Sequence, residues 1–190
     1  MKKMKHTTFT MIFLQMATFI ILIPSVQSTL SHTSLLEQIC RQSHHYHICT
    51  MTLRSSINHR SKEDIAGFAS LTLEIVKANA SLTLEHAQKS YIQANGLEQK
   101  RAMRDCLALY NMMVNVHLRE ALNAMEKCDY KIVKQRVYAA SIQAQTCENK
   151  FKNSSTKPLK DTNQYVQNLC IIATSIVNKL LLQNHLTSAY

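Results

Sequence analysis

The sequence predicts an all-α protein: an up-down-up-down four-helix bundle with an N-terminal helical hairpin, stapled by disulfides. Three observations carry this prediction. Only two glycines and two prolines occur in 190 residues, so few positions can break a helix. Apolar residues recur every three or four positions through long stretches, which is the spacing of one helical face. Six cysteines are spread along the chain, as in secreted proteins that rely on disulfides.

The first 28 residues have the three-part layout of a secretory signal peptide. A cluster of lysines precedes an uncharged apolar run over residues 11–23, and small or polar residues follow up to Ser28. This run covers about 20 Å as a helix, less than the ~30 Å hydrocarbon core of a membrane. We therefore expect residues 1–28 to be removed, which leaves one secreted domain over residues 29–190 with no membrane anchor.

Residues 33–58 are expected to form the N-terminal helical hairpin that precedes the bundle. The first bundle helix is predicted to start after Ser61, whose hydroxyl can cap it, with Asp64 as the acid three residues on. It should end at the Asn-Gly pair of residues 95–96, a C-terminal cap signal. Its inward positions include Ile65, Phe68, Ala69, Thr72, Val76 and Thr83.

Three further helices are expected. The second bundle helix covers residues 98–126, the third ends at about residue 152, and the fourth begins at about residue 162. The connections between them are short, which implies antiparallel neighbours. Their apolar stripes are, in order, Leu107, Tyr110, Val114, Leu118, Ala121 and Met125; Val133, Val137, Ala140, Ala144, Cys147 and Phe151; and Val166, Leu169, Cys170, Ala173, Ile176, Val177, Leu180 and Leu181.

This topology restricts how the cysteines can pair. At ~1.5 Å per residue, Cys106, Cys147 and Cys170 lie about 8–12 Å above the same end of the bundle, whereas Cys128 lies at the other end. A bridge needs Cα atoms within ~7 Å, so Cys128 has no partner within the chain. An exposed thiol there could link two copies into a homodimer. Height alone does not choose a pair among the other three.

The sequence contains no set of residues that predicts catalysis. It has no Gly-x-Ser-x-Gly, glycine-rich loop or His-Glu-x-x-His motif, and its acids are scattered. We interpret His44, His45 and His47 as a solvated turn rather than a zinc or copper site. We therefore expect neither an enzyme nor a cofactor or metal.

Lys and Arg outnumber Asp and Glu by 22 to 12, which favours acidic partners outside the cell rather than nucleic acid.

Two N-glycosylation patterns occur, Asn79-Ala80-Ser81 and Asn153-Ser154-Ser155. Asn153 lies in a predicted polar loop, where a glycan is easily accommodated. Asn79 lies within a predicted helix, so its use depends on facing outward.

An ordered set of motifs runs through the predicted bundle. It consists of Ile39-Cys40 with Cys49 nine residues on, Asp105-Cys106 followed by Tyr110, Ala139-Ala140 to Thr146-Cys147, Phe151, and Asn168-Leu169-Cys170 with Ile172 and Ala173. In this order and spacing the chain resembles the plant invertase and pectin methylesterase inhibitor family over residues 36–182. The resemblance implies that Cys40 pairs with Cys49 and Cys106 with Cys147, while Cys170 remains a buried thiol. Cys128 does not match a position of the family.

The resemblance also implies a function. Members bind a plant enzyme one to one and cover its substrate cleft, so the expected activity is inhibition without turnover in the cell wall or apoplast. Invertase inhibitors of this kind carry a Pro-Lys-Phe triplet where this chain has Tyr130, Lys131 and Ile132. The Asp129-Tyr130 junction and Asn168-Leu169-Cys170 look more like the pectin methylesterase branch, in which Thr146 would contact the enzyme.

Three functions remain as alternatives. The first is inhibition of pectin methylesterase, with Thr146, Tyr130 and Lys131 as candidate contacts. The second is inhibition of invertase. The third is a secreted helical signalling or structural role, since helical bundles serve many functions.

Overall fold

The computed structural model describes residues 35–57 and 64–187. The predicted signal peptide and Ser61 lie outside the described residues. The chain divides into two compact units, residues 1–38 and residues 39–190. In the first unit, the described residues 35–38 are helical. The second unit contains all the elements discussed below.

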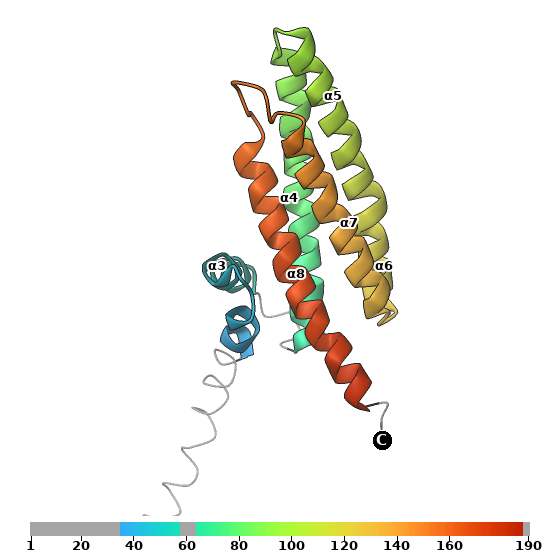
Figure 1. The fold of residues 1–190 in the computed structure, drawn as a ribbon. Helices are drawn as coiled ribbons and strands as arrows, with labels where there is room; N and C mark the ends of the chain where they lie inside the picture. The colour runs from blue at the N-terminus through green and yellow to red at the C-terminus, as the bar shows by residue number, and fades with distance from the viewer. Residues whose placement is uncertain (1–34, 58–63, 188–190) are drawn as a thin grey trace, which may run out of the picture. The chain divides into compact units, whose positions relative to one another are not determined.

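The second unit is a helical bundle, and its described residues contain no strand. Helices α4, α5–α6, α7 and α8 run side by side with alternating direction (Figure 1), and each packs against its neighbours along the chain, with α8 returning to α4. This arrangement confirms the predicted up-down-up-down bundle. The elements are α3 Tyr46–Ser56, α4 Ile65–Gln93, α5 Leu97–Met112, the π-helical segment η1 Met113–His117, α6 Leu118–Glu126, α7 Tyr130–Asn149 and α8 Lys160–Thr187.

Both predicted ends of α4 differ in detail from the structure. Asp64, expected inside the first turn, is itself the N-cap: its backbone is extended and its carboxylate accepts a hydrogen bond from the Gly67 amide at 2.6 Å. A carboxylate satisfies a free amide there and suits the positive end of the helix dipole. At the other end, α4 stops at Gln93 with Ala94 as C-cap, and Gly96 is the N-cap of α5 with a φ of −112°. The Asn-Gly pair therefore marks a connection rather than a left-handed cap.

The second bundle helix contains a π turn that the sequence did not predict. The segment Met113–His117 lies between α5 and α6 without ending the helix. Both Met113 and Val114 are buried, because the wider turn directs two consecutive side chains inward. The regular spacing of Tyr110, Val114 and Leu118 gave no sign of this extra residue.

The apolar stripes predicted for the bundle form most of its core. Phe151 is buried just beyond the end of α7, whereas the side chains of Ile65, Leu107 and Leu181, also predicted to face inward, are only half-buried. An 18-residue stretch within Lys160–Asn184 of α8 has a mean hydropathy of 1.3, so by length and composition alone this helix could cross a membrane. In this bundle that apolar character is accounted for by packing, because α8 contacts both α4 and α7.

Candidate functional site

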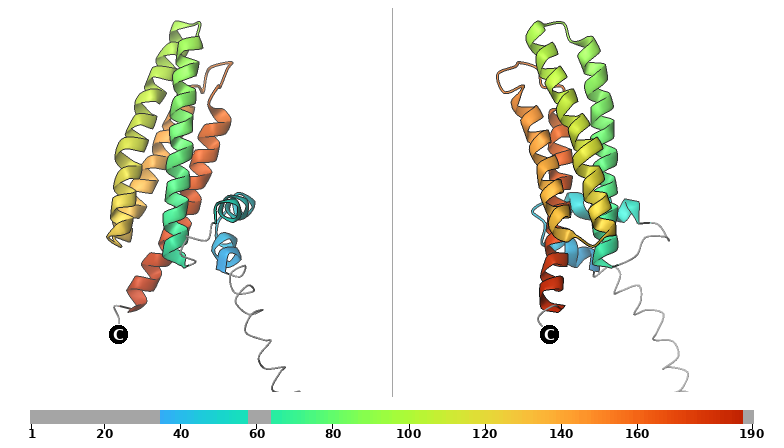
Figure 2. Two further views of the ribbon diagram at one scale, coloured as in Figure 1. Left: turned by 180° about the vertical axis from the view of Figure 1, so that it is seen from behind. Right: turned by 90° about the vertical axis from the view of Figure 1, so that its right-hand side faces the viewer.

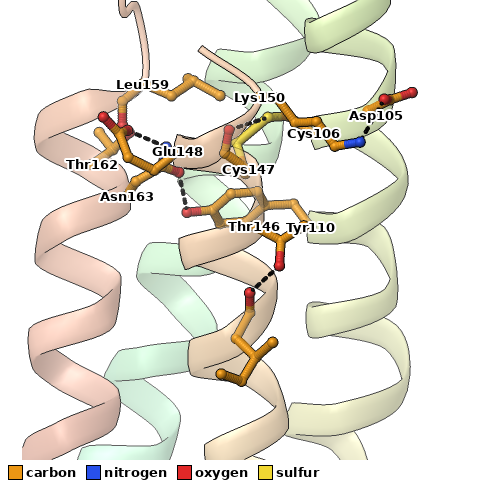
Figure 3. The surroundings of a disulfide bond; sticks show 11 residues. Asp105, Cys106, Tyr110, Thr146, Cys147, Glu148, Lys150, Leu159, Thr162 and Asn163 are labelled. Atoms are coloured by element: carbon orange, nitrogen blue, oxygen red, sulfur yellow. Dashed lines mark hydrogen bonds and ion pairs between the residues drawn. A yellow bond between two sulfur atoms is a disulfide. The ribbon is translucent and has the colours of Figure 1, made fainter. Parts of the chain in front are cut away.

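A buried disulfide fixes α5 against α7. Cys106 and Cys147 are joined with a Cα–Cα distance of 4.9 Å, and both residues are fully buried (Figure 3). A second bridge joins Cys40 and Cys49, with a Cα–Cα distance of 5.5 Å. These are the two pairs that the family resemblance implies. Because the Cys106–Cys147 bridge sets the register of the two helices, it also sets the positions of the outward residues beside it.

The outward residues beside this bridge surround a groove between α5 and α7. Lys150 forms an ion pair with Asp105 at 3.0 Å, and both residues line the groove together with Thr146. The Thr146 hydroxyl donates to the Ile142 carbonyl at 2.7 Å, so its polar group is already satisfied (Figure 3). The groove has a volume of about 420 Å³ and is lined by Asp105, Ala108, Leu109, Met112, Gln143, Thr146 and Lys150.

Large apolar side chains are exposed around this groove. Tyr138 is 63% exposed, Ile142 38% and Met112 46%. On α7, Tyr138, Ile142 and Thr146 are four residues apart, so they lie on one face. We call the surface formed by Asp105, Leu109, Met112, Tyr138, Ile142, Thr146 and Lys150 the α5–α7 face. An apolar centre with a polar rim is the arrangement found at protein–protein interfaces.

A buried hydrogen-bond chain supports this face from behind. The Tyr110 hydroxyl donates to Asn163 Oδ1 at 2.7 Å, and Asn163 Nδ2 donates to Glu148 Oε2 at 2.9 Å (Figure 3). Burial, followed by the nearby Cys170, raises the pKa of Tyr110 above its usual value, so the phenol stays a neutral donor. The chain connects α5, α8 and α7. It therefore makes the region behind the groove rigid.

The structure does not bring all the predicted contact residues together. Tyr130 and Lys131 begin α7, where the Asp129 carboxylate caps the helix by accepting from the Ile132 amide at 3.2 Å. Tyr130 is only 8% exposed, so it offers little surface to a partner, whereas Lys131 is exposed. Thr146 lies 15 residues further along α7, about 22 Å away at ~1.5 Å per residue.

The two free thiols have opposite environments. Cys170 is fully buried, and burial raises the pKa of its thiol to about 12. Cys128 is exposed and has a positive φ of 55°. Its amide donates to the Met125 carbonyl and the Asp129 amide to the Ala124 carbonyl, which is the hydrogen-bond pattern that ends a helix with a left-handed residue. Glycine is the usual residue at such a position because it has no Cβ to strain the backbone.

We predict that Cys128 links two chains in part of the purified protein and that Cys128→Gly abolishes this reducible dimer. Glycine also relieves the left-handed strain, so unfolding should require about 0.5–1 kcal/mol more free energy than in the wild type. Gel filtration with and without reductant, together with a denaturant titration, measures both effects. Labelling of Cys170 in the native variant should be negligible. A wild type that stays monomeric under oxidising conditions contradicts the dimer.

Asn153 and Asn79 lie in different surroundings. Asn153 is exposed in the turn that follows α7. Asn79 is half-exposed within α4, and its Nδ2 donates to the Ile75 carbonyl at 2.8 Å. Glycosylation of either residue stays a prediction.

A metal site is not formed by the part of the chain that the structure describes. Across residues 35–57 and 64–187, no group of three or more His, Cys, Asp and Glu side chains could hold an ion. His44 is exposed in the turn before α3, and His47 is exposed in the first turn of α3.

The family resemblance proposed Thr146 as a contact, but sequence reasoning did not find the other residues that line the groove. Asp105 was noted only as part of a cysteine motif, and Leu109, Met112 and Gln143 were not identified. Met112 directly precedes the π turn, which changes the direction of the side chains that follow. No periodicity in the sequence could have shown that it lies beside Thr146.

The chain is similar to known proteins in both sequence and fold. A family model described as plant invertase/pectin methylesterase inhibitor matches residues 34–176. The chain is similar to the cell wall / vacuolar inhibitor of fructosidase 1 of Arabidopsis thaliana, with 27% identity over 146 residues that cover 77% of this chain and 69% of the relative.

Two solved structures have a similar fold. One is a crystal structure of a pectin methylesterase inhibitor from Arabidopsis thaliana, with a TM-score of 0.60 and 25% identity, covering 77% of this chain and 96% of that chain. The other is a mutant form of a pectin methylesterase inhibitor from Arabidopsis, with a TM-score of 0.68 and 24% identity, covering 75% of this chain and 95% of that chain.

Proposed function

Because the chain belongs to the plant invertase/pectin methylesterase inhibitor family, we propose that it is a secreted inhibitor of a plant pectin methylesterase. Members of this family are inhibitors of enzymes and are not enzymes themselves. The inhibitor acts in the cell wall by forming a one-to-one complex in which the α5–α7 face covers the substrate cleft.

The observation that carries the proposal is the position of Thr146. Its side chain lies in the wall of an open groove, directly before the cysteine that bridges α7 to α5. Exposed apolar groups flank it on both helices, and burying them against a partner provides the driving force for association. The disulfide and the buried Tyr110–Asn163–Glu148 chain hold this surface in one shape, so little conformational entropy is lost on binding.

Charge supports an acidic partner. Without the three lysines of the predicted signal peptide, 19 Lys and Arg remain against 12 Asp and Glu, a formal net charge of +7. This charge speeds the encounter with an acidic cleft and makes the association rate sensitive to salt. Charge does not by itself select the enzyme, since either target could carry such a cleft.

Inhibition of invertase is the second candidate. The similarity to a fructosidase inhibitor favours it. The contact would then lie at the other end of α7, where Lys131 is exposed beside Asp129. Against it, only the lysine of the triplet is kept: Ile132 stands at the phenylalanine position, and Tyr130, at the proline position, is buried.

Titration of the purified protein against one pectin methylesterase and one invertase tests the proposal. We expect saturable loss of demethylation at a one-to-one ratio, with the inhibitor recovered intact and the invertase unaffected. Loss of invertase activity alone would reverse the assignment. No effect on either enzyme would favour a secreted signalling or structural role.

A further inference from the structure

A second groove lies between α4 and the first turns of α8. These two helices pack against each other and run side by side in the left view of Figure 2, on the opposite edge of the bundle from the α5–α7 face. The groove has a volume of about 460 Å³ and is lined by Asn79, Leu82, Thr83, His86, Asp161, Thr162 and Tyr165. This volume falls within the range of about 300–1,000 Å³ that is typical of sites for small organic groups.

Asn79 in this wall is also the acceptor of a glycosylation pattern. Its amide nitrogen donates one hydrogen to the Ile75 carbonyl at 2.8 Å. A primary amide carries two hydrogens, so a sugar can replace one while the other keeps this bond. Ala80 behind it is fully buried, whereas Asn79 itself is half-exposed. A glycan on Asn79 would therefore extend outward into the groove and leave the helix intact.

The rest of the groove has the mixed character that a sugar ring requires. Leu82 is 62% exposed and Tyr165 37% exposed. Both therefore present apolar surface to solvent in the wall of the groove. The Tyr165 hydroxyl lies 3.3 Å from Thr52 Oγ1 of α3, so the ring is held in position. A sugar has an apolar face that stacks on an aromatic ring, and its hydroxyls can bond to polar groups such as the exposed His86 and Asp161.

We propose that Asn79 carries an N-linked oligosaccharide whose first sugars lie in the α4–α8 groove against Leu82 and Tyr165. The donor is an oligosaccharide joined to a lipid diphosphate. A bond forms between Asn79 Nδ2 and the anomeric carbon of the first sugar, the bond from that carbon to the diphosphate breaks, and the amide loses one proton as the lipid diphosphate leaves. The transfer takes place during secretion, so this inference rests on the secretion that is part of the proposed function.

The oligosaccharide also restricts how the inhibitor binds its enzyme. It covers the edge formed by α4 and α8 and leaves the opposite α5–α7 face open. Asn153 provides an internal comparison, because it is the acceptor of the second pattern and lies in an exposed turn. A glycan on Asn153 would extend into solvent.

Occupancy is tested on the full chain secreted from plant cells, by mass analysis of its glycopeptides. We expect sugar on Asn79 in the wild type and none in Ser81→Ala, which removes the pattern but keeps the asparagine. Alanine favours a helix, so the fold is retained although the bond from Ser81 Oγ to the Lys77 carbonyl is lost. An unmodified Asn79 beside a modified Asn153 overturns the inference and leaves secretion standing. Sugar on Asn79 without inhibition of pectin methylesterase supports the inference and overturns the proposed function.

The position of the sugar is tested by the rate at which a glycan-releasing amidase acts on the native protein. Release from Asn79 should be about tenfold slower than release from Asn153, which corresponds to about 1.4 kcal/mol of protection. Tyr165→Ala should remove most of this difference, whereas the matched change Tyr138→Ala on α7 should not. Equal rates at the two asparagines in the wild type overturn the placement of the sugar in the groove.

Discussion

Replacing Thr146 with arginine should weaken the inhibition of pectin methylesterase by about 30-fold or more, equivalent to ~2 kcal/mol of binding free energy. Thr146 is in the middle of the α5–α7 face, where the partner would exclude water. A longer charged side chain fills the groove beside Met112 and Gln143, and its charge has to be desolvated without a prepared partner. The inhibition constant, measured by demethylation at several inhibitor concentrations, gives the effect.

Two control variants separate this effect from general damage. Gln88→Arg places the same side chain on the exposed surface of α4, a helix diagonal to α7, and should leave inhibition unchanged. Lys131→Glu changes a charge at the far end of α7 and should also have little effect on this enzyme. The helical circular dichroism of Thr146→Arg should match the wild type, because arginine is a good helix former. Full inhibition by Thr146→Arg would exclude the α5–α7 face as the contact.

Removing the disulfide between α5 and α7 should cause the largest loss of stability. The two cysteines are 41 residues apart, and the chain-entropy model gives about 4 kcal/mol for closing a loop of this length. In the double variant Cys106→Ala/Cys147→Ala the melting temperature should fall on the order of 10 °C. Alanine is used at both positions because it leaves no thiol to exchange with Cys170 and no hydroxyl buried without a partner.

The hairpin disulfide is the matched control. Cys40 and Cys49 are nine residues apart, so the same model gives about 2.5 kcal/mol for Cys40→Ala/Cys49→Ala. The first pair should also reduce inhibition of the enzyme, because α7 loses its register against α5, whereas the second pair should not. A greater loss of stability from the hairpin pair would contradict this ordering. Reductant-free calorimetry and inhibition assays on both variants give the comparison.

The sequence alone determined the elements of this fold and their order. Few helix breakers and the three-or-four spacing of apolar residues predicted the long helices, and short connections predicted their alternating directions. These features are local, so each can be read from one segment at a time. Axial height, obtained from the rise per residue, also separated Cys128 from the other cysteines of the bundle. The family resemblance, rather than periodicity, supplied the disulfide pairs and drew attention to Thr146.

Only the tertiary structure decided how the helices face one another. Cys106, Cys147 and Cys170 have similar heights, and the rotation of each helix about its axis makes Cys147 the partner of Cys106 and leaves Cys170 in the core. The same rotations bury Tyr130 and bring Met112 beside Thr146. Periodicity fixes the angle between residues on one helix but not the angle between two helices. That second angle comes from the packing of all the side chains together, including the π turn at residues 113–117, which the spacing of apolar residues did not reveal.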